Sequence, residues 1–367
     1  MRKNPFTFYC LFMLFALLIY IRKESMGDIK FHKDLLFLAL TFCGLLKFRV
    51  KNFPKVLYPI ILLAFFNMYR STAPTVYLHY TMVWAGFLFL GMCLSYEMDK
   101  VILRRGFILL GVIQTLYLLA NHYFNYIPMF GHAVVFVGGK WVPAASHQLP
   151  IPPGALGNPM VSAGGLALLL PFFFSSVAGF VLLPLILYGV WLTNSALAYM
   201  ALPITIWTWG LTRIRGWGWR LIYLLWTLIG SILSYKVLSN LNFFQDGTRG
   251  KMWEIAVKAV TRPIEGHGLG IFKDQFTRIA MTQVDMKNVW AQAHSDYVEI
   301  FVAFGLIGLS TLIILLSRMR IRRESWQFLA VMFIFLSQCY GSFPLHISFL
   351  TAITIMCYSV TVHTRNP

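Results

Sequence analysis

Twelve apolar segments dominate the sequence, and short polar segments separate most of them. A helix needs about 20 residues to cross the hydrocarbon core of a bilayer, and fewer where polar ends extend to the interface. We therefore predict an all-α, polytopic membrane protein with about 12 transmembrane helices. Neither a linker nor a sequence repeat divides the chain, which we interpret as a single transmembrane domain over residues 1–367. The predicted spans are 6–21, 34–47, 56–69, 76–96, 102–120, 159–174, 177–192, 194–211, 218–236, 295–316, 326–341 and 345–362.

The composition agrees with a membrane protein. Hydrophobic residues make up 58% of the chain and charged residues only 12%, whereas a soluble domain carries about 25% charged residues. Phe occurs 32 times, Tyr 17 times and Trp 11 times. This aromatic content suits a lipid-facing surface with aromatic belts at both interfaces.

The net charge of +18 raises the question of nucleic-acid binding. The basic residues are placed otherwise, because many lie in short clusters between apolar segments, at 47–55, 212–220 and 317–325. Such clusters are typical of cytoplasmic loops under the positive-inside rule. We therefore expect no nucleic-acid partner and place both termini in the cytoplasm. The hairpin at 22–33 is an exception, since it carries four basic and two acidic residues on the predicted outer side.

The five cysteines all lie within apolar segments, and their spacing matches neither a CxxC motif nor a metal finger. We interpret them as packed or lipid-facing residues. The first apolar segment follows Arg2 and Lys3 as in a signal peptide. Arg22, Lys23 and Glu24 then stand where small cleavage-site residues would be needed, so we expect a retained first helix.

Two long polar segments lie on the predicted outer side. The first, 121–158, is rich in Pro, Gly and His, and we expect a loop or a partly re-entrant cap. The second, 237–293, is strongly charged and separates predicted spans nine and ten. It contains an amphipathic stretch that predicts a helix over 251–262, ended by Pro263. Trp253 and Val257 on this helix suit contact with lipid.

Four short motifs follow one another from the second outer segment into the next span. An Arg precedes a Trp-bearing helix; a Pro and a glycine-rich turn follow; an Ala-His pair then opens a span that contains two glycines. The motifs are Gly247-Thr-Arg249-Gly-Lys-Met-Trp253, Gly266-His-Gly268-Leu-Gly270-Ile-Phe272, Ala293-His294-Ser-Asp-Tyr297 and Gly305-Leu-Ile-Gly308. In this order and spacing they resemble the bacterial O-antigen ligase/polymerase superfamily over about 65 residues.

The resemblance implies glycan transfer on the outer face of the bacterial cytoplasmic membrane. The implied donor is a glycan on undecaprenyl diphosphate. The implied acceptor is a second lipid-linked glycan for a polymerase, or lipid A–core for a ligase. Membrane lipid and other polysaccharide-assembly proteins are the further implied partners. By resemblance, His294 is the general base and Arg249 faces the diphosphate.

These two roles make chemical sense. The acceptor hydroxyl must lose its proton as it attacks the anomeric carbon, and an imidazole titrates in the useful range. The leaving diphosphate is already anionic and needs cations, for which the planar arginine side chain is well suited. We therefore expect neither a metal nor a cofactor.

The sequence departs from the family at one position. Ala196 stands where the family has an arginine, in Thr193-Asn194-Ser195-Ala196. Arg70, at the outer end of the third predicted span, or Lys236, at the outer end of the ninth, could replace this arginine, and the sequence does not choose between them. The further candidates to bind the diphosphate or the glycan are Arg70, Lys236, Lys251, Arg262, Arg278, Tyr297 and His346, with Lys140, His132 and His147 in the first outer segment.

Some of these residues also have simpler interpretations. His294 could cap the start of a helix, and Arg249 could neutralise Asp246 or Glu254. The glycine-rich motif at 266–270 lacks the strand and the Gly-Lys-Ser/Thr of a phosphate-binding loop. We expect a tight turn there.

The leading function is therefore an integral-membrane glycosyltransferase of the O-antigen polymerase or ligase type, with a slight preference for a polymerase. The alternative is a transporter or flippase of a lipid-linked sugar or small anion. A transporter would place ionisable residues at the bilayer midplane, often on broken helices. Here the ionisable residues gather at the predicted outer surface, which favours surface chemistry.

Overall fold

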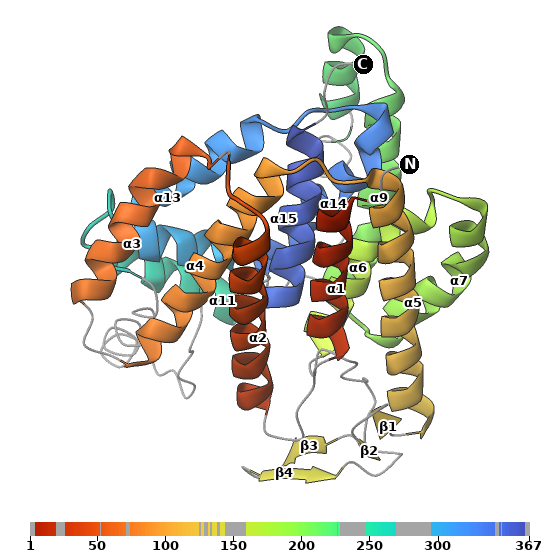
Figure 1. The fold of residues 1–367 in the computed structure, drawn as a ribbon, viewed down its shortest axis with the longest axis horizontal. Helices are drawn as coiled ribbons and strands as arrows, with labels where there is room; N and C mark the ends of the chain where they lie inside the picture. Colours follow the sequence, from red (N-terminus) through yellow and green to blue (C-terminus); the bar gives the residue numbers. More distant parts are fainter. Residues whose placement is uncertain are drawn as a thin grey trace.

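The computed structural model is a bundle of helices whose long members run side by side (Figure 1). It describes residues 4–19, 26–51, 53–70, 74–124, 126–127, 131–132, 134–137, 140–143, 159–225, 227, 247–268, 295–341, 345 and 347–363. The helices are α1 (Pro5–Ile19), α2 (Met26–Lys47), η1 (Lys55–Leu57), α3 (Tyr58–Arg70), α4 (Pro74–Ser95), α5 (Lys100–Phe124), α6 (Pro159–Phe173), α7 (Val177–Leu192), α8 (Ala196–Tyr199), α9 (Ala201–Arg213), α11 (Gly247–Lys258), α13 (Asp296–Ser317), η2 (Arg323–Ser325), α14 (Trp326–Gly341) and α15 (Ser348–Val362).

Most predicted spans coincide with these helices. The bounds of α7 and α14 agree with the predicted 177–192 and 326–341. The predicted span 218–236 is helical over 217–225, and most of its remainder lies outside the described residues. Within the described part of the chain, two helices, α5 and α13, are long and apolar enough by themselves to cross a membrane. Shorter apolar helices stand at several of the other predicted spans.

Two helices differ from the prediction for clear physical reasons. Helix α2 begins at Met26 rather than at residue 34, because its first turns are polar and hydropathy does not detect them. The predicted span 194–211 is divided into α8 and α9. Pro203 has no N–H, and its ring would collide with the carbonyl of Tyr199 in a continuous helix, so the chain breaks at Met200.

The first outer segment contributes two short antiparallel pairs of strands to an otherwise helical fold. Strand β1 (Tyr126–Ile127) pairs with β2 (Gly131–His132), and β3 (Val134–Val137) pairs with β4 (Lys140–Pro143). Tyr126 lies opposite His132, and Val137 lies opposite Lys140. In Figure 1 both pairs lie at one end of the bundle, beyond the end of α5.

Helix α6 forms the centre of the bundle, where it contacts α5, α7, α9, α14 and α15. Two buried glutamines bind its backbone from opposite sides. The side-chain amide of Gln114 on α5 donates to the Ser162 carbonyl over 2.7 Å, and that of Gln338 on α14 donates to the Gly164 carbonyl over 3.3 Å. Gly164 and Gly165 provide the room for these amides.

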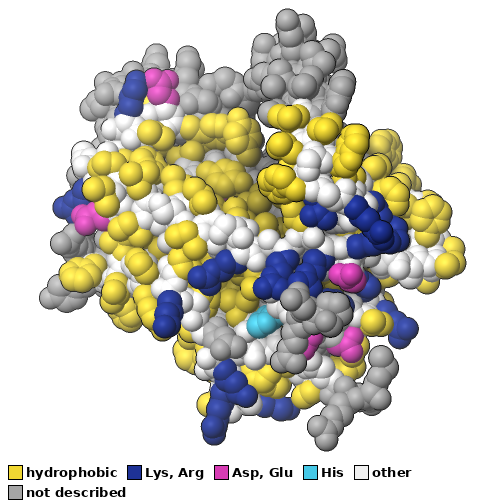
Figure 2. Space-filling view, turned by 90° about the horizontal axis from the view of Figure 1, so that it is seen from above, with side chains coloured by type: hydrophobic (Ala, Val, Ile, Leu, Met, Phe, Trp, Pro, Cys, Tyr) yellow, Lys and Arg dark blue, Asp and Glu magenta, His cyan; other side chains and the backbone are white. Residues whose placement is uncertain are grey.

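The basic loops share the opposite end of the bundle. The Lys51 N–H donates to the Ser95 hydroxyl over 2.7 Å, and Arg104 donates to the Glu324 carbonyl. Helix α1 begins and α15 ends at this end (Figure 1). Figure 2 shows Lys and Arg side chains gathered on this face. The fold therefore separates a basic end from the end that carries the strands, as a positive-inside arrangement requires.

Candidate active site

The structure places the predicted site residues in three groups. His294, Lys236, Arg278, His346 and His147 lie outside the described residues. Arg249 and Lys251 lie in the first turns of α11, Arg70 is the last residue of α3, and His132 and Lys140 lie in β2 and β4. For Arg262 and Tyr297 the structure also gives side-chain contacts, to Glu265 and to the Leu336 carbonyl. The site is therefore built from α11, the turn after it, and the first half of α13.

Helix α11 begins and ends about one turn earlier than the predicted 251–262. The helical hydrogen bonds continue to Ala259, whose N–H donates to Ile255. Pro263 does not end the helix. The chain leaves it at Thr261, because the Thr261 N–H donates to the ring of His267 rather than back into the helix.

One face of α11 packs on the protein. Ile255 and Ala256 are buried, while Val257 is 47% exposed, and its contact with lipid stays a prediction. Trp253 is half-buried, with its ring edge-on to Tyr340 at the end of α14 and 5.2 Å between the ring centres. Arg249 precedes Trp253 in α11 by four residues, about one helical turn.

The start of α13 is bonded to α14 by its first residues. Ser295 is the N-cap residue of α13, and its hydroxyl donates to the Cys339 carbonyl over 3.1 Å. The Tyr297 hydroxyl donates to the Leu336 carbonyl over 2.7 Å. Because Ser295 occupies the N-cap position, the interpretation of His294 as the cap of this helix loses its support.

Asp296 was not singled out in the sequence. It is 1% exposed, and its carboxylate accepts a hydrogen bond from the Leu345 N–H over 2.9 Å. Asp296 and Glu299 both lie in the first turn of α13, where negative charge is favoured by the helix dipole. An acid two residues after a candidate histidine was the available signal in the sequence. The Leu345 N–H that binds the Asp296 carboxylate lies 49 residues further along the chain, and the sequence gives no signal for this contact.

Helix α13 is broken at Gly305, whose φ of 58° and ψ of −148° are non-helical. In an unbroken helix, Leu306 and Ile307 would donate to Val302 and Ala303. Here Leu306 donates to the Pro263 carbonyl over 2.8 Å, and Ile307 donates to the Ile264 carbonyl over 3.2 Å.

The turn after α11 supplies the missing donors of the break as well. The His267 N–H donates to the Val302 carbonyl over 2.8 Å, and the Gly268 N–H donates to the Ala303 carbonyl over 2.9 Å. Residues 263–268 thus take up all four backbone groups of the two broken helical bonds. We name these four bonds, with the two glycines below, the α11–α13 clamp.

Two glycines make this close approach possible. A Cβ on Gly266 would lie 2.5 Å from the Ala303 carbonyl, and a Cβ on Gly305 would lie 2.5 Å from the Ile264 carbonyl. Both glycines have positive φ, of 70° and 58°, which other residues rarely adopt. The prediction of a tight turn is confirmed at Gly266 and Gly268. Their N–H groups bind Arg262 and Ala303 and are not available to a phosphate.

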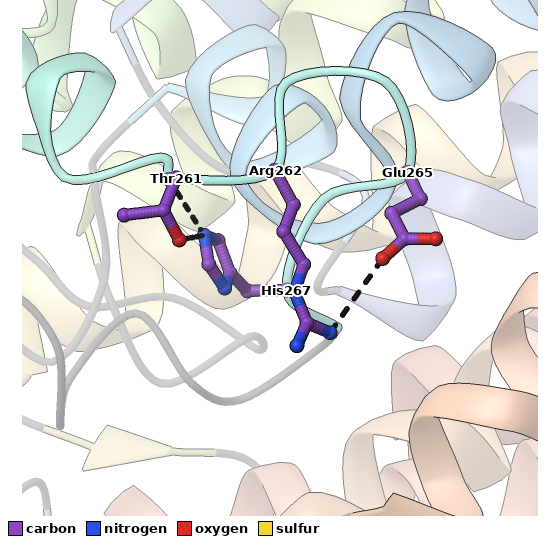
Figure 3. Close-up of polar contacts among 4 residues, drawn as sticks. All are labelled: Thr261, Arg262, Glu265 and His267. Carbon is purple, nitrogen blue, oxygen red and sulfur yellow. Dashed lines mark hydrogen bonds and ion pairs between the residues drawn. The ribbon is translucent and has the colours of Figure 1, made fainter.

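Figure 3 shows the polar contacts of this turn. The ring Nε2 of His267 accepts from the Thr261 N–H over 3.0 Å, and Arg262 forms an ion pair with Glu265 at 3.5 Å. Burial and the neighbouring Arg262 charge lower the pKa of His267, and Glu265 opposes them. On α11, Glu254 pairs with Lys258 at 2.6 Å, which lowers the pKa of Glu254.

The described part of the chain offers little to a metal ion. No three His, Cys, Asp or Glu side chains cluster within it. What the arrangement does offer is a polar turn and two helix starts, α11 and α13, held together against the end of α14. Such an arrangement can orient a base and a cation, which is the chemistry that an anionic donor requires.

Comparison with known proteins gives one family match. No curated protein matches the chain. Residues 179–313 match the family model described as O-antigen ligase. The match begins at α7 and includes α11, the α11–α13 clamp and most of α13. It supports glycan transfer of the O-antigen ligase or polymerase type, and an inner-membrane location that agrees with the apolar helices. The match over this segment supports the resemblance of the sequence to the O-antigen ligase/polymerase superfamily.

Proposed function

We propose that this protein transfers a glycan from undecaprenyl diphosphate to an acceptor sugar hydroxyl on the outer face of the cytoplasmic membrane. The acceptor is a second lipid-linked glycan or lipid A–core, and we favour the former, that is, a polymerase. The protein is a multi-pass inner-membrane protein with both termini in the cytoplasm.

One relationship carries this proposal. Ser295, the residue after His294, bonds to the carbonyl of Cys339. Trp253, one helical turn after Arg249, packs on Tyr340. Cys339 and Tyr340 are consecutive, and one turn of α14 therefore receives both candidate segments. This supports placing the imidazole and the guanidinium on one wall of a common site.

The proposed roles follow from their chemistry. His294 removes the proton from the acceptor hydroxyl as its oxygen attacks the anomeric carbon of the donor. The bond from that carbon to the diphosphate breaks, and Arg249 stabilises the negative charge on the departing undecaprenyl diphosphate. Two phosphates need more than one cation, and the candidates are Arg70, Lys140, Lys236, Lys251, Arg262 and Arg278. The reaction as proposed uses neither a metal nor a cofactor.

The contacts of the described residues favour some of these candidates over others. Glu254 has Lys258 as its ion-pair partner, which argues against the view that Arg249 serves to neutralise Glu254. Arg262 already has Glu265 beside it and contributes less net charge than an unpaired cation. The hydroxyl of Tyr297 is bonded to Leu336, which favours a role in fixing α13 over direct binding of substrate.

The break in α13 also bears on the transporter alternative. Transporters use the free backbone groups of broken helices to bind substrates and ions. Here residues 263–268 occupy the four groups of the two broken bonds. The break therefore serves attachment of the outer segment, and we retain the transferase as the better-supported function.

The test uses purified protein with a lipid-linked oligosaccharide donor and each acceptor in turn. His294→Ala should lower transfer by roughly 10²–10⁴-fold, the range of general-base contributions, and leave donor binding intact. His363→Ala, at the opposite end of the bundle, is the matched control and should transfer glycan at the wild-type rate. Wild-type transfer by His294→Ala would eliminate the general-base role. Transfer to lipid-linked glycan alone identifies a polymerase, and transfer to lipid A–core identifies a ligase.

A further inference from the structure

The α11–α13 clamp joins two segments whose relative position matters for the proposed reaction. Helix α11 carries Arg249, and the first half of α13 follows directly on His294. The clamp joins the turn after α11 to the break in α13. It consists of backbone N–H···O bonds at 2.8 to 3.2 Å, the ordinary range for such bonds, and it joins the two segments without an intervening flexible side chain.

The clamp is also specific to glycine at two positions. Any side chain at Gly266 would meet the backbone at Ala303 and Phe304, with all three nearest atoms 2.5 Å away. Any side chain at Gly305 would meet the backbone at Pro263 and Ile264, also at 2.5 Å. Backbone atoms can't rotate aside as a flexible side chain can. A substitution must therefore separate the turn from the break.

A further set of contacts attaches the first half of α13 to α3 and α14. The cluster of Ile60, Ala64, Ala303 and Phe304 packs α3 across the break. The first residues of α13 are bonded to α14, as described above. With both neighbours attached, the first half of α13 has a defined position, and the clamp transfers that position to α11.

We propose that Gly266 and Gly305 are positioning residues, whose backbone contact sets the placement of Arg249 relative to His294. The inference rests on the proposed function. It assigns to this glycine pair the alignment of base and cation, rather than contact with substrate. A misplacement of about 1 Å at a distance from the chemistry can lower a rate by the order of 10²-fold.

The first arm of the test measures amide hydrogen exchange in the wild-type protein in detergent or nanodiscs. The N–H groups of His267, Gly268, Leu306 and Ile307 should be strongly protected, although 267 and 268 belong to a turn. Exchange of these four amides at the rate of an open loop would overturn the proposal, whether or not transfer is observed.

The second arm uses Gly305→Ala and Gly266→Ala in the full chain. Each should abolish protection of the four clamp amides, leave α14 and α15 protected, and lower kcat on the order of 10²-fold per folded molecule with little change in the KM for donor. The double variant should be no worse than either single variant, because the clamp is already open. Gly86→Ala, where a new Cβ meets nothing within 4 Å, is the control.

The outcomes separate the proposals. Glycine variants that lose protection of the clamp amides but keep the wild-type kcat would overturn the positioning role. So would variants whose rate falls only in proportion to the fraction of folded protein. If neither glycine variant folds, Leu306→Pro removes one clamp donor without a new Cβ at either glycine and should give the same kinetic pattern. Absence of transfer by the wild type would count against the proposed function alone, since the exchange arm does not depend on it.

Discussion

The backbone N–H of Thr261 donates a hydrogen bond to the ring Nε2 of His267 over 3.0 Å. The ring must be neutral at Nε2 to accept it. Burial and Arg262 both lower the pKa of His267 from its ordinary value, so the fold favours the neutral ring. This bond turns the chain out of α11 and towards the break in α13.

A pH dependence of this turn follows. A lowered pKa in the folded state means that the unfolded state binds the proton more readily. The stability from the neutral ring is fully present above the unfolded-state pKa of about 6.5. It is lost as the pH falls through the lower folded-state value. The exchange protection factor of the Thr261 amide should fall over this range, and His267→Ala should remove the dependence.

Tyr297 tests the attachment of α13 to α14. Tyr297→Phe loses the bond to Leu336 and should lower stability by about 0.5–1.5 kcal/mol, as for a typical hydrogen bond. Thermal unfolding in detergent measures this effect. Tyr358→Phe is a matched control, because it loses a similar bond of 2.9 Å to Leu315 elsewhere in the bundle. A raised KM for either substrate in Tyr297→Phe, absent from Tyr358→Phe, would show that Tyr297 binds substrate after all.

The centre of the bundle gives a prediction independent of function. A Cβ on Gly165 would lie 2.7 Å from the Gln114 amide nitrogen. Gly165→Ala should therefore destabilise the fold by about 1–3 kcal/mol through overpacking. Shortening the glutamine in the double variant Gly165→Ala/Gln114→Ala removes the clash. The loss of stability in the double variant should therefore be smaller than the sum of the losses in the two single variants. Additive losses in thermal unfolding, with Gly86→Ala unchanged, would contradict this contact.

The helices could be predicted well because the signals for them are local. Helix α14 lies between the basic cluster ending at Arg323 and the Ser342-Phe343-Pro344 sequence after Gly341, and both limits are visible in the sequence. Helix α2 was predicted too short because its polar first turns carry no hydropathy signal. The number of membrane crossings stays a prediction.

The α11–α13 clamp could not be predicted in the same way. Its bonds join backbone groups of residues about 40 positions apart, and backbone groups have no sequence signature. Gly305 in an apolar segment reads as a tolerated helix residue. The motifs around Arg249 and His294 lie within the family match at residues 179–313, and the roles of these two residues stay predictions. The contacts of Ser295 and Asp296 depend on residues of α14 and Leu345, which only the fold brings near.

The last prediction compares two arginines that were both candidates to bind the diphosphate. Arg249 is proposed to hold the diphosphate in both ground and transition states, so Arg249→Ala should weaken donor binding and lower kcat/KM together. Arg262 is half-exposed and paired with Glu265, and such surface pairs are worth about 0–1 kcal/mol. Arg262→Ala should therefore change kcat/KM by less than about fivefold. Donor binding and initial rates of the two purified variants provide the comparison. A larger loss in Arg262→Ala than in Arg249→Ala would move the diphosphate from α11 to the turn that follows it.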